Sequence, residues 1–264
     1  MSEGKNMSFL DHLEELRWRL VRCAIAILAI ATVLFLYQEW IMEKLFLSMK
    51  DPNFISFKVM CRTFGICIEE IPVKMQSMTV SGQFSYALMT SLMGGIVLAF
   101  PFIFYQLWSF VKPGLKQKEQ TVAKGIVFYV SLLFFFGILF GYFVIAPLTI
   151  QFFGTYQISK QIENNFTISS YMSMILSTVF YTGLLFLLPV VMYIFSKLGI
   201  VTPRFLRKYR KHAIVGVLIL SAAITPPDVL SQIIVSIPII ILYEISILVS
   251  ARVEKNMIKD QLSK

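Results

Sequence analysis

The sequence predicts an all-α integral membrane protein with six transmembrane helices, and three observations carry this prediction. Apolar residues make up 57% of the 264 residues and charged residues only 15%, a balance that soluble domains do not show. Six apolar windows lie between the charged segments, and a helix needs about 20 apolar residues to cross a bilayer. The basic residues gather in alternate connections, which places both the N-terminus and the C-terminus on the cytoplasmic side.

The spans are predicted from the windows without charge, since a charged side chain is costly at the centre of a bilayer. They cover about residues 18–37, 83–110, 125–146, 168–195, 213–226 and 229–250. Pro101 and Pro189 should kink or divide the second and fourth spans, and Pro147 should end the third. Gly137 and Gly141 form a small-residue face on the third, suited to close helix packing. No polar stretch is long enough for a soluble domain, so residues 1–264 are predicted to form a single membrane domain.

The fifth and sixth predicted helices are short. The fifth rises only about 20 Å against a hydrocarbon core of about 30 Å, so either the bilayer thins there or neighbouring helices shield the mismatch. A re-entrant segment is the alternative. It would place the basic residues of 197–211 and those of the C-terminal tail on opposite sides of the membrane.

The basic residues sort strongly between the two sides. With the N-terminus inside, 18 of the 24 lysines and arginines fall in cytoplasmic segments, as the positive-inside rule requires. The same rule accounts for the net charge of +9, which therefore does not indicate a nucleic-acid partner.

No catalytic or metal-binding motif is found in the sequence. His12 and His212 are far apart, and no phosphate-binding loop, nucleophile elbow or cysteine–histidine cluster with ligand spacing occurs. An enzyme is therefore not expected, and no metal or cofactor is predicted. No stretch resembles a cleavable signal peptide, because the first apolar run follows charged and amphipathic residues.

The acidic residues of FLDHLEELRWRL, just before the first span, gain nothing from the positive-inside rule. Apolar residues recur there at helical spacing, and the opposite face is charged. Intrahelical ion pairs, Glu14 with Arg17 and Glu15 with Arg19, would explain the acids. Glu119, the only acid in a lysine-rich cytoplasmic loop, would be a salt-bridge partner by the same reasoning. Held together at the headgroup level, however, Glu15 and Glu119 would bind a cationic ligand, and a guanidinium suits carboxylates best.

The remaining polar residues near the membrane have two interpretations each. Asp228, with Gln232 one helical turn further on, either caps the sixth helix or has a function at the outer mouth. Glu244, near the inner end of the sixth span, is either a functional acid or a side chain that snorkels. Cys61 and Cys67 lie in an external loop of some forty residues. An oxidising periplasm would permit a disulfide between them, and free thiols are equally compatible with the sequence.

Three long motifs resemble one family. HLEELRWRL, FPFIFYQLWSFVKPGLKQKE and ITPPDVLSQIIVSIPIIILYE are similar in order and spacing to the TatC family, the multi-spanning subunits of the twin-arginine protein translocase, over about residues 8–252. The resemblance implies a receptor in the plasma (inner) membrane of a bacterium. It would bind the paired arginines of N-terminal signal peptides and export folded proteins with the proton-motive force. Its partners would be single-span TatA/TatB-type proteins, in a complex where the chain is a homo-oligomer.

The resemblance also implies roles for individual residues. The two carboxylates of the arginine-pair site would be Glu15 and Glu119, with Arg17 as the local counter-charge. Phe110 and Pro113 would frame the loop that carries Glu119, and Asp228 and Gln232 would act on the outer side in partner contact.

The chain departs from the family pattern in its fourth span. Leu187 and Leu188 stand where many members have a polar residue that binds a partner, so that role is either lost or taken over by Thr182. The main alternative function is a six-span secondary transporter for a small solute, because broken helices and sparse membrane acids also fit that class. No internal repeat is visible to favour it. A passive membrane scaffold is the third hypothesis.

Overall fold

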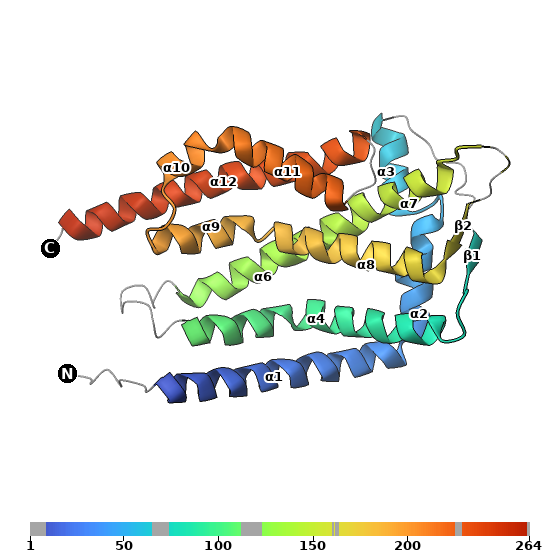
Figure 1. The fold of residues 1–264 in the computed structure, drawn as a ribbon, viewed down its shortest axis with the longest axis horizontal. Coiled ribbons are helices and arrows are strands. Elements are labelled where there is room, and N and C mark those ends of the chain that lie inside the picture. Colours follow the sequence, from blue (N-terminus) through green and yellow to red (C-terminus); the bar gives the residue numbers. More distant parts are fainter. Residues whose placement is uncertain are drawn as a thin grey trace. The chain divides into compact units, whose positions relative to one another are not determined.

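The structure is a computed structural model that describes residues 9–64, 74–111, 123–159, 161, 164–224 and 229–262. These residues are almost entirely helical (Figure 1), and two compact units can be distinguished, residues 1–42 with 83–132 and residues 43–82 with 133–264. In the described part of the chain, five helical segments are long and apolar enough to cross a membrane. They are His12–Leu36, Gly82–Val111, Gly125–Thr155, Ile168–Lys197 and Gln232–Met257.

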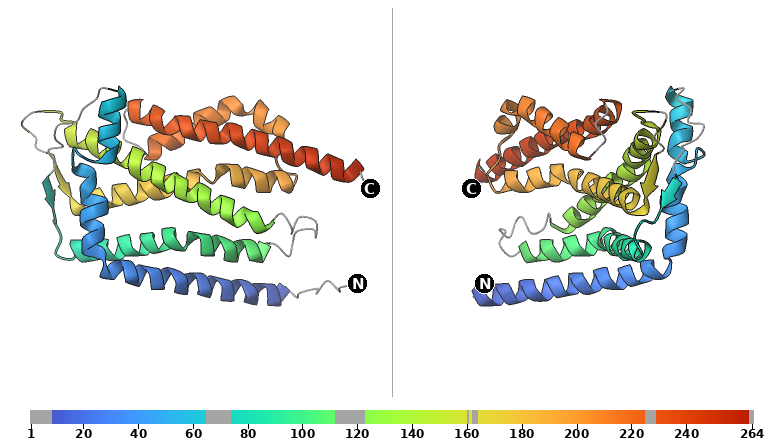
Figure 2. Two further views of the ribbon diagram at one scale, coloured as in Figure 1. Left: turned by 180° about the vertical axis from the view of Figure 1, so that it is seen from behind. Right: turned by 45° about the vertical axis from the view of Figure 1, so that its right-hand side comes forward.

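Two long helices, α1 (Phe9–Leu36) and α4 (Gly82–Val111), dominate the first unit. They lie side by side and antiparallel (Figures 1 and 2). Their separation is small near Gly95, where an added Cβ would come within 2.8 Å of the backbone oxygen of Ile27; small residues allow such an approach. Helix α4 continues through Pro101, so this proline does not divide the second span. The unit also contains α2 (Gln38–Ile41) and the start of α6 (Ala123–Phe140).

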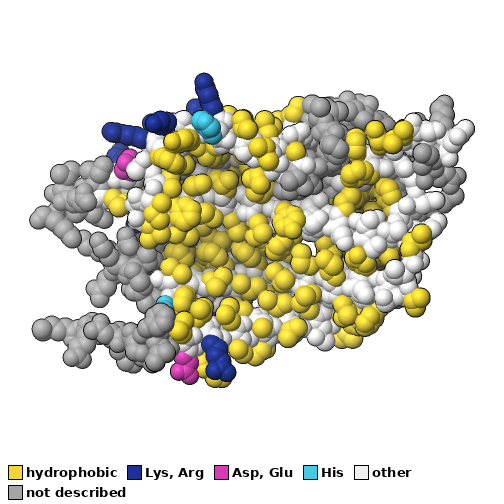
Figure 3. Space-filling model, in the orientation of Figure 1, with side chains coloured by type: hydrophobic (Ala, Val, Ile, Leu, Met, Phe, Trp, Pro, Cys, Tyr) yellow, Lys and Arg dark blue, Asp and Glu magenta, His cyan; other side chains and the backbone are white. Residues whose placement is uncertain are grey.

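The outward face of α1 is apolar. Ile25 and Leu28 are 62% and 59% exposed, whereas Cys23 and Ala31 are buried. Figure 3 shows a face of the molecule on which hydrophobic side chains predominate and few charged ones are visible. Contiguous apolar surface of this kind is unfavourable in water and is matched by lipid chains. The exposure pattern is that of a membrane helix.

The second unit continues α6 without a break into a π-helical turn, η4 (Gly141–Ile145), and then α7 (Ala146–Thr155). The prediction that the third helix ends before Pro147 is therefore wrong. Pro147 stands in the first turn of α7, where a missing N–H is tolerated. The π-helical turn re-sets the hydrogen-bond register just ahead of it. Pro189 does mark the predicted interruption, between α8 (Ile168–Leu185) and α9 (Leu188–Lys197).

The glycine face predicted on the third span packs inside the second unit. A Cβ on Gly137 would lie 2.9 Å from the Cα of Gly183, and one on Gly141 would lie 2.9 Å from the Cα of Val179. Both partners belong to α8. Small residues on both helices thus let their backbones approach closely, and the face is used for packing within the chain.

The C-terminal part consists of α10 (Pro203–Lys208), α11 (Arg210–Ile224) and α12 (Val229–Leu262). Helix α12 packs along α9 and α11, and two buried serine pairs join these helices, Ser196 with Ser250 at 2.7 Å and Ser236 with Ser221 at 3.1 Å. As predicted, α11 is short, with 15 residues. The sixth helix is not short: α12 has 34 residues, because nothing after Ser250 breaks a helix once the apolar run has ended.

The long connection after the first span is folded rather than extended. It contains η1 (Met42–Phe46), η2 (Leu47–Lys50), α3 (Ile55–Phe64) and the strand β1 (Lys74–Gln76), which pairs in parallel with β2 (Asn165–Thr167). Tyrosines of the long helices hold it in place. The hydroxyl groups of Tyr142 and Tyr171 donate to the backbone oxygens of Leu45 and Phe46, at 2.8 and 2.7 Å.

Candidate functional site

In the N-terminal part of α1, three polar side chains lie on the side of the helix that faces α4. His12, Glu15 and Arg19 recur at helical spacing and are partly buried, whereas Leu13 and Leu20 are 45% and 52% exposed. The predicted charged face is therefore divided: Glu15 and Arg19 are partly buried, whereas Glu14 and Arg17 are exposed. Apolar side chains can point outwards at a membrane because lipid covers them, while polar side chains in that environment need partners within the protein.

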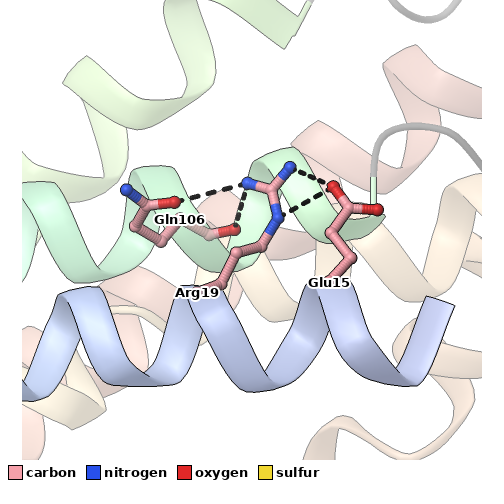
Figure 4. A network of polar contacts seen from close by, with 3 residues as sticks. All are labelled: Glu15, Arg19 and Gln106. Atoms are coloured by element: carbon pink, nitrogen blue, oxygen red, sulfur yellow. Dashed lines mark hydrogen bonds and ion pairs between the residues drawn. The ribbon is translucent and has the colours of Figure 1, made fainter. Parts of the chain in front are cut away.

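Glu15 and Arg19 form a hydrogen-bonded pair that is completed by α4 (Figure 4). The Nε and Nη2 atoms of Arg19 donate to Oε1 of Glu15 at 3.0 and 2.5 Å. The Nη1 atom of Arg19 faces the buried Gln106, whose backbone oxygen and Oε1 lie 3.3 and 3.4 Å away. The predicted pairing of Glu15 with Arg19 is confirmed, and the counter-charge of Glu15 is Arg19 rather than Arg17.

The second oxygen of Glu15, Oε2, is buried and has no hydrogen-bond donor among the described residues. A buried acceptor left unsatisfied costs roughly 1–3 kcal/mol, and more when the group is charged. The carboxylate is therefore fixed through one oxygen and open to a donor at the other.

An aromatic stack lies one helical turn before Glu15. The rings of His12 and Phe110 are stacked with their centroids 4.2 Å apart and 13° between their planes. Phe110, a predicted site residue, is thereby brought to the same end of the α1–α4 pair as Glu15. His12 was not predicted as a site residue, although its position three residues before Glu15 places it on the same helical face.

Glu14 and Arg17 are both exposed, and the described part of the chain contains no ion pair between them. The predicted Glu14–Arg17 pair is therefore wrong. Two long side chains on the outside of a helix gain little from pairing in water, while they lose conformational entropy.

The predicted site residues Pro113, Glu119 and Asp228 lie outside the described residues, as does Cys67. Gln232 is described, and its amide donates to the backbone oxygen of Leu218 at 3.2 Å, which ties α12 to α11. Cys61 is disulfide-bonded, and its pairing with Cys67 stays a prediction.

Two further polar residues of the second unit have internal partners. Glu244 accepts a hydrogen bond from Nη2 of Arg210 at 2.6 Å, with both side chains about half exposed. This ion pair accounts for the acid in the sixth span. Thr182 is buried and donates to the backbone oxygen of Thr178 at 2.7 Å, so its side chain is not offered to a partner helix.

The apolar helices, five of which are long enough to cross a membrane in the described part of the chain, define a class, the multi-pass membrane proteins. A family model described as "Sec-independent protein translocase protein (TatC)" matches residues 11–238. The chain belongs to the TatC family.

Individual relatives resemble the chain over most of its length. It is 35% identical to the Sec-independent protein translocase protein TatC of Blattabacterium sp. subsp. Periplaneta americana, over 96% of this chain and 98% of that protein. It is also 35% identical to TatCy of Bacillus subtilis, over 92% and 89%. A crystal structure of the twin-arginine translocase receptor TatC in DDM has a TM-score of 0.69 and 30% identity, over 90% of this chain and 99% of that chain.

Proposed function

We propose that this chain is the signal-peptide receptor and core subunit of a twin-arginine translocase, which exports folded proteins with the proton-motive force. The carboxylate of Glu15 carries the proposal. One of its oxygens is bound to Arg19, and the other has no donor among the described residues. A guanidinium of the signal peptide would supply that donor. The solved structure of a twin-arginine translocase receptor, which shares the fold at a TM-score of 0.69, supports the same role.

Glu119 supplies the second carboxylate of the proposed arginine-pair site, and Pro113 and Phe110 frame it. Two carboxylates from separate segments match two adjacent guanidinium groups, each of which presents a planar fork of donors. A lysine ammonium is a point charge and fits such a site less well. Selectivity for Arg-Arg over Lys-Lys follows. Arg17, which is exposed beside the site, helps to hold the flank on the cytoplasmic side.

The proposed topology has six spans in the bacterial inner (plasma) membrane, with both termini in the cytoplasm. Helix α11 is the fifth span. Its contacts with α12, Arg210 with Glu244, Ser221 with Ser236 and Leu218 with Gln232, support an antiparallel crossing. Its 15 residues rise only about 22 Å, so α12 and the other helices of the second unit must shield the mismatch.

The proposed partners are single-span proteins of the TatA/TatB type, in a complex in which this chain is a homo-oligomer. Asp228 and Gln232 would contact those partners on the outer side. The Gln232 amide that already bonds to Leu218 would then hold the outer end of α12 in place for that contact.

Crosslinking and export test the proposal together. A photoreactive twin-arginine signal peptide should crosslink to positions around Glu15 and Glu119, and Glu15→Ala with Glu119→Ala should abolish export of a twin-arginine reporter. Glu14→Ala is the matched control, because Glu14 is adjacent but exposed and unpaired with Arg17. Crosslinks only elsewhere, or unchanged export by the double variant, would overturn the site assignment.

A further inference from the structure

Gln106 is an unusual residue in the polar cluster between α1 and α4. It is only 6% exposed, and a buried amide is retained where it has hydrogen bonds to make. Both its backbone oxygen and its side-chain oxygen accept from Nη1 of Arg19, at 3.3 and 3.4 Å (Figure 4). The acceptors of Gln106 are thus directed at an arginine of the neighbouring helix rather than at Glu15.

Arg19 is a built-in competitor for any arginine that approaches Glu15. A guanidinium gains most from a carboxylate when it forms two parallel bonds, one to each oxygen. In the structure both Nε and Nη2 of Arg19 donate to the same oxygen, Oε1, and Oε2 has no donor in the part of the chain that the structure describes. Arg19 therefore stops short of the full fork that it is chemically able to form.

The position of Nη1 explains this restraint. It is held by α4 through two acceptors of Gln106, and a planar guanidinium cannot rotate towards Oε2 without giving them up. The backbone oxygen would remain after any substitution at this position. Only the hydrogen bond to the side-chain oxygen depends on the presence of glutamine.

We propose that Gln106 is a positioning residue of the arginine-pair site. By anchoring Arg19 to α4, it limits this arginine to one oxygen of Glu15 and keeps Oε2 for the guanidinium of the signal peptide. The inference rests on the proposed function of Glu15 as one half of that site.

Gln106→Leu removes the side-chain acceptor at nearly constant volume and so tests whether this oxygen positions Arg19. We expect the Kd of a fluorescent twin-arginine signal peptide, measured on the full-length protein in lipid nanodiscs, to rise about tenfold. Gln106→Glu keeps an acceptor oxygen at the same place and should bind the peptide as tightly as the original protein. Gln106→Asn keeps an amide but moves the side-chain acceptor back by one carbon, so the Kd should rise in this variant too. It therefore serves as the test if Gln106→Leu does not fold.

A second substitution separates positioning from a general effect on packing. If Gln106 acts through Arg19, then adding Arg19→Gln to Gln106→Leu removes the competitor, and the double variant should bind the peptide more tightly than Gln106→Leu alone. It should still bind less tightly than the original protein, because Glu15 also loses the side chain that orients it. A purely structural role predicts that the double variant binds more weakly than Gln106→Leu alone.

Unchanged affinity in both Gln106→Leu and Gln106→Asn, or further loss in the double variant, would overturn the inference. Failure of the proposed function gives a different result. In that case Glu15→Gln would bind the twin-arginine peptide as well as the original protein does, whatever the variants at position 106 show.

Discussion

Glu14 and Glu15 are neighbours in the chain, yet their side chains meet different surroundings. Successive residues on a helix point about 100° apart, so Glu15 faces α4 and Glu14 is exposed. Only the inward residue gains a fixed orientation, through Arg19 and then Gln106. A carboxylate that is held in place loses less conformational entropy when it binds a ligand, which supports Glu15 rather than Glu14 as the proposed arginine-binding group.

The Arg210–Glu244 pair is a second ion pair near the end of the spans, and its exposure limits its worth. The side chains are 50% and 40% exposed, so water and salt screen the attraction. This pair holds the start of α11 beside α12 but does not decide the stability of the unit.

We expect a double-mutant cycle with Arg210→Gln and Glu244→Gln to give a coupling energy below about 1 kcal/mol. The coupling should shrink further when the salt concentration is raised, because exposed pairs are screened. Unfolding of the purified protein in detergent by SDS titration would measure it. A coupling of several kcal/mol that does not depend on salt would show that the pair is shielded from solvent.

At the scale of elements, the end of α9 is shaped by Gly199. This residue has a φ of 72°, the left-handed region that favours glycine. The N–H of Gly199 donates to Ser196 and that of Ile200 to Phe195, at 3.1 and 3.0 Å, which is the hydrogen-bond pattern of a Schellman cap. The cap stops α9 and turns the chain towards α10.

The same substitution at two glycines should have opposite effects on stability. Gly199→Ala should lower the free energy of unfolding by about 1 kcal/mol, because a Cβ is disfavoured at positive φ. Gly216→Ala, inside α11 with nothing within 4 Å of the new Cβ, should raise it by up to about 1 kcal/mol through helix propensity. SDS titration of both variants checks the signs. A loss of equal size in both would show that the left-handed conformation of Gly199 is not the cause.

Element boundaries show which signals the sequence carries and which it does not. The interruption at Pro189 was predictable because a proline inside a helix removes a hydrogen bond, and so was the short α11. The passage through Pro147 was not, since it depends on a π-helical turn just before the proline that no hydropathy window detects. The length of α12 was not predicted, because an apolar window shows how much of a helix lies in the membrane and not how far the helix continues beyond it.

At the scale of the whole molecule, the helical membrane class followed from composition, while the six-span count and the sidedness stay predictions and the candidate site followed only in part. The Glu15–Arg19 pair lies within one helix and could be predicted from spacing four apart. The contacts of Gln106 with Arg19 and of His12 with Phe110 depend on the antiparallel packing of α1 and α4. This packing joins residues about ninety positions apart, and spacing within one segment carries no information about it.

The side of the membrane on which the last connections lie depends on whether α11 crosses the bilayer. Helix α12 has 34 residues, or about 51 Å, so it extends well beyond the ~30 Å hydrocarbon core. The start of α11 lies beside Glu244, and Ser196 at the end of α9 lies beside Ser250. The basic segment of α10 is therefore at the level of the C-terminal part of α12.

We accordingly expect Lys208→Cys and Lys255→Cys, both exposed positions, to be labelled from the same side of the membrane. In intact cells an impermeant maleimide should reach neither of them, and after permeabilisation it should label both. Lys58→Cys, exposed in the connection predicted outside, is the matched control and should be labelled in intact cells. Each variant is made without the native Cys23. Labelling of Lys255→Cys but not Lys208→Cys in intact cells would mean that α11 does not cross the bilayer, and the re-entrant alternative would replace the six-span topology.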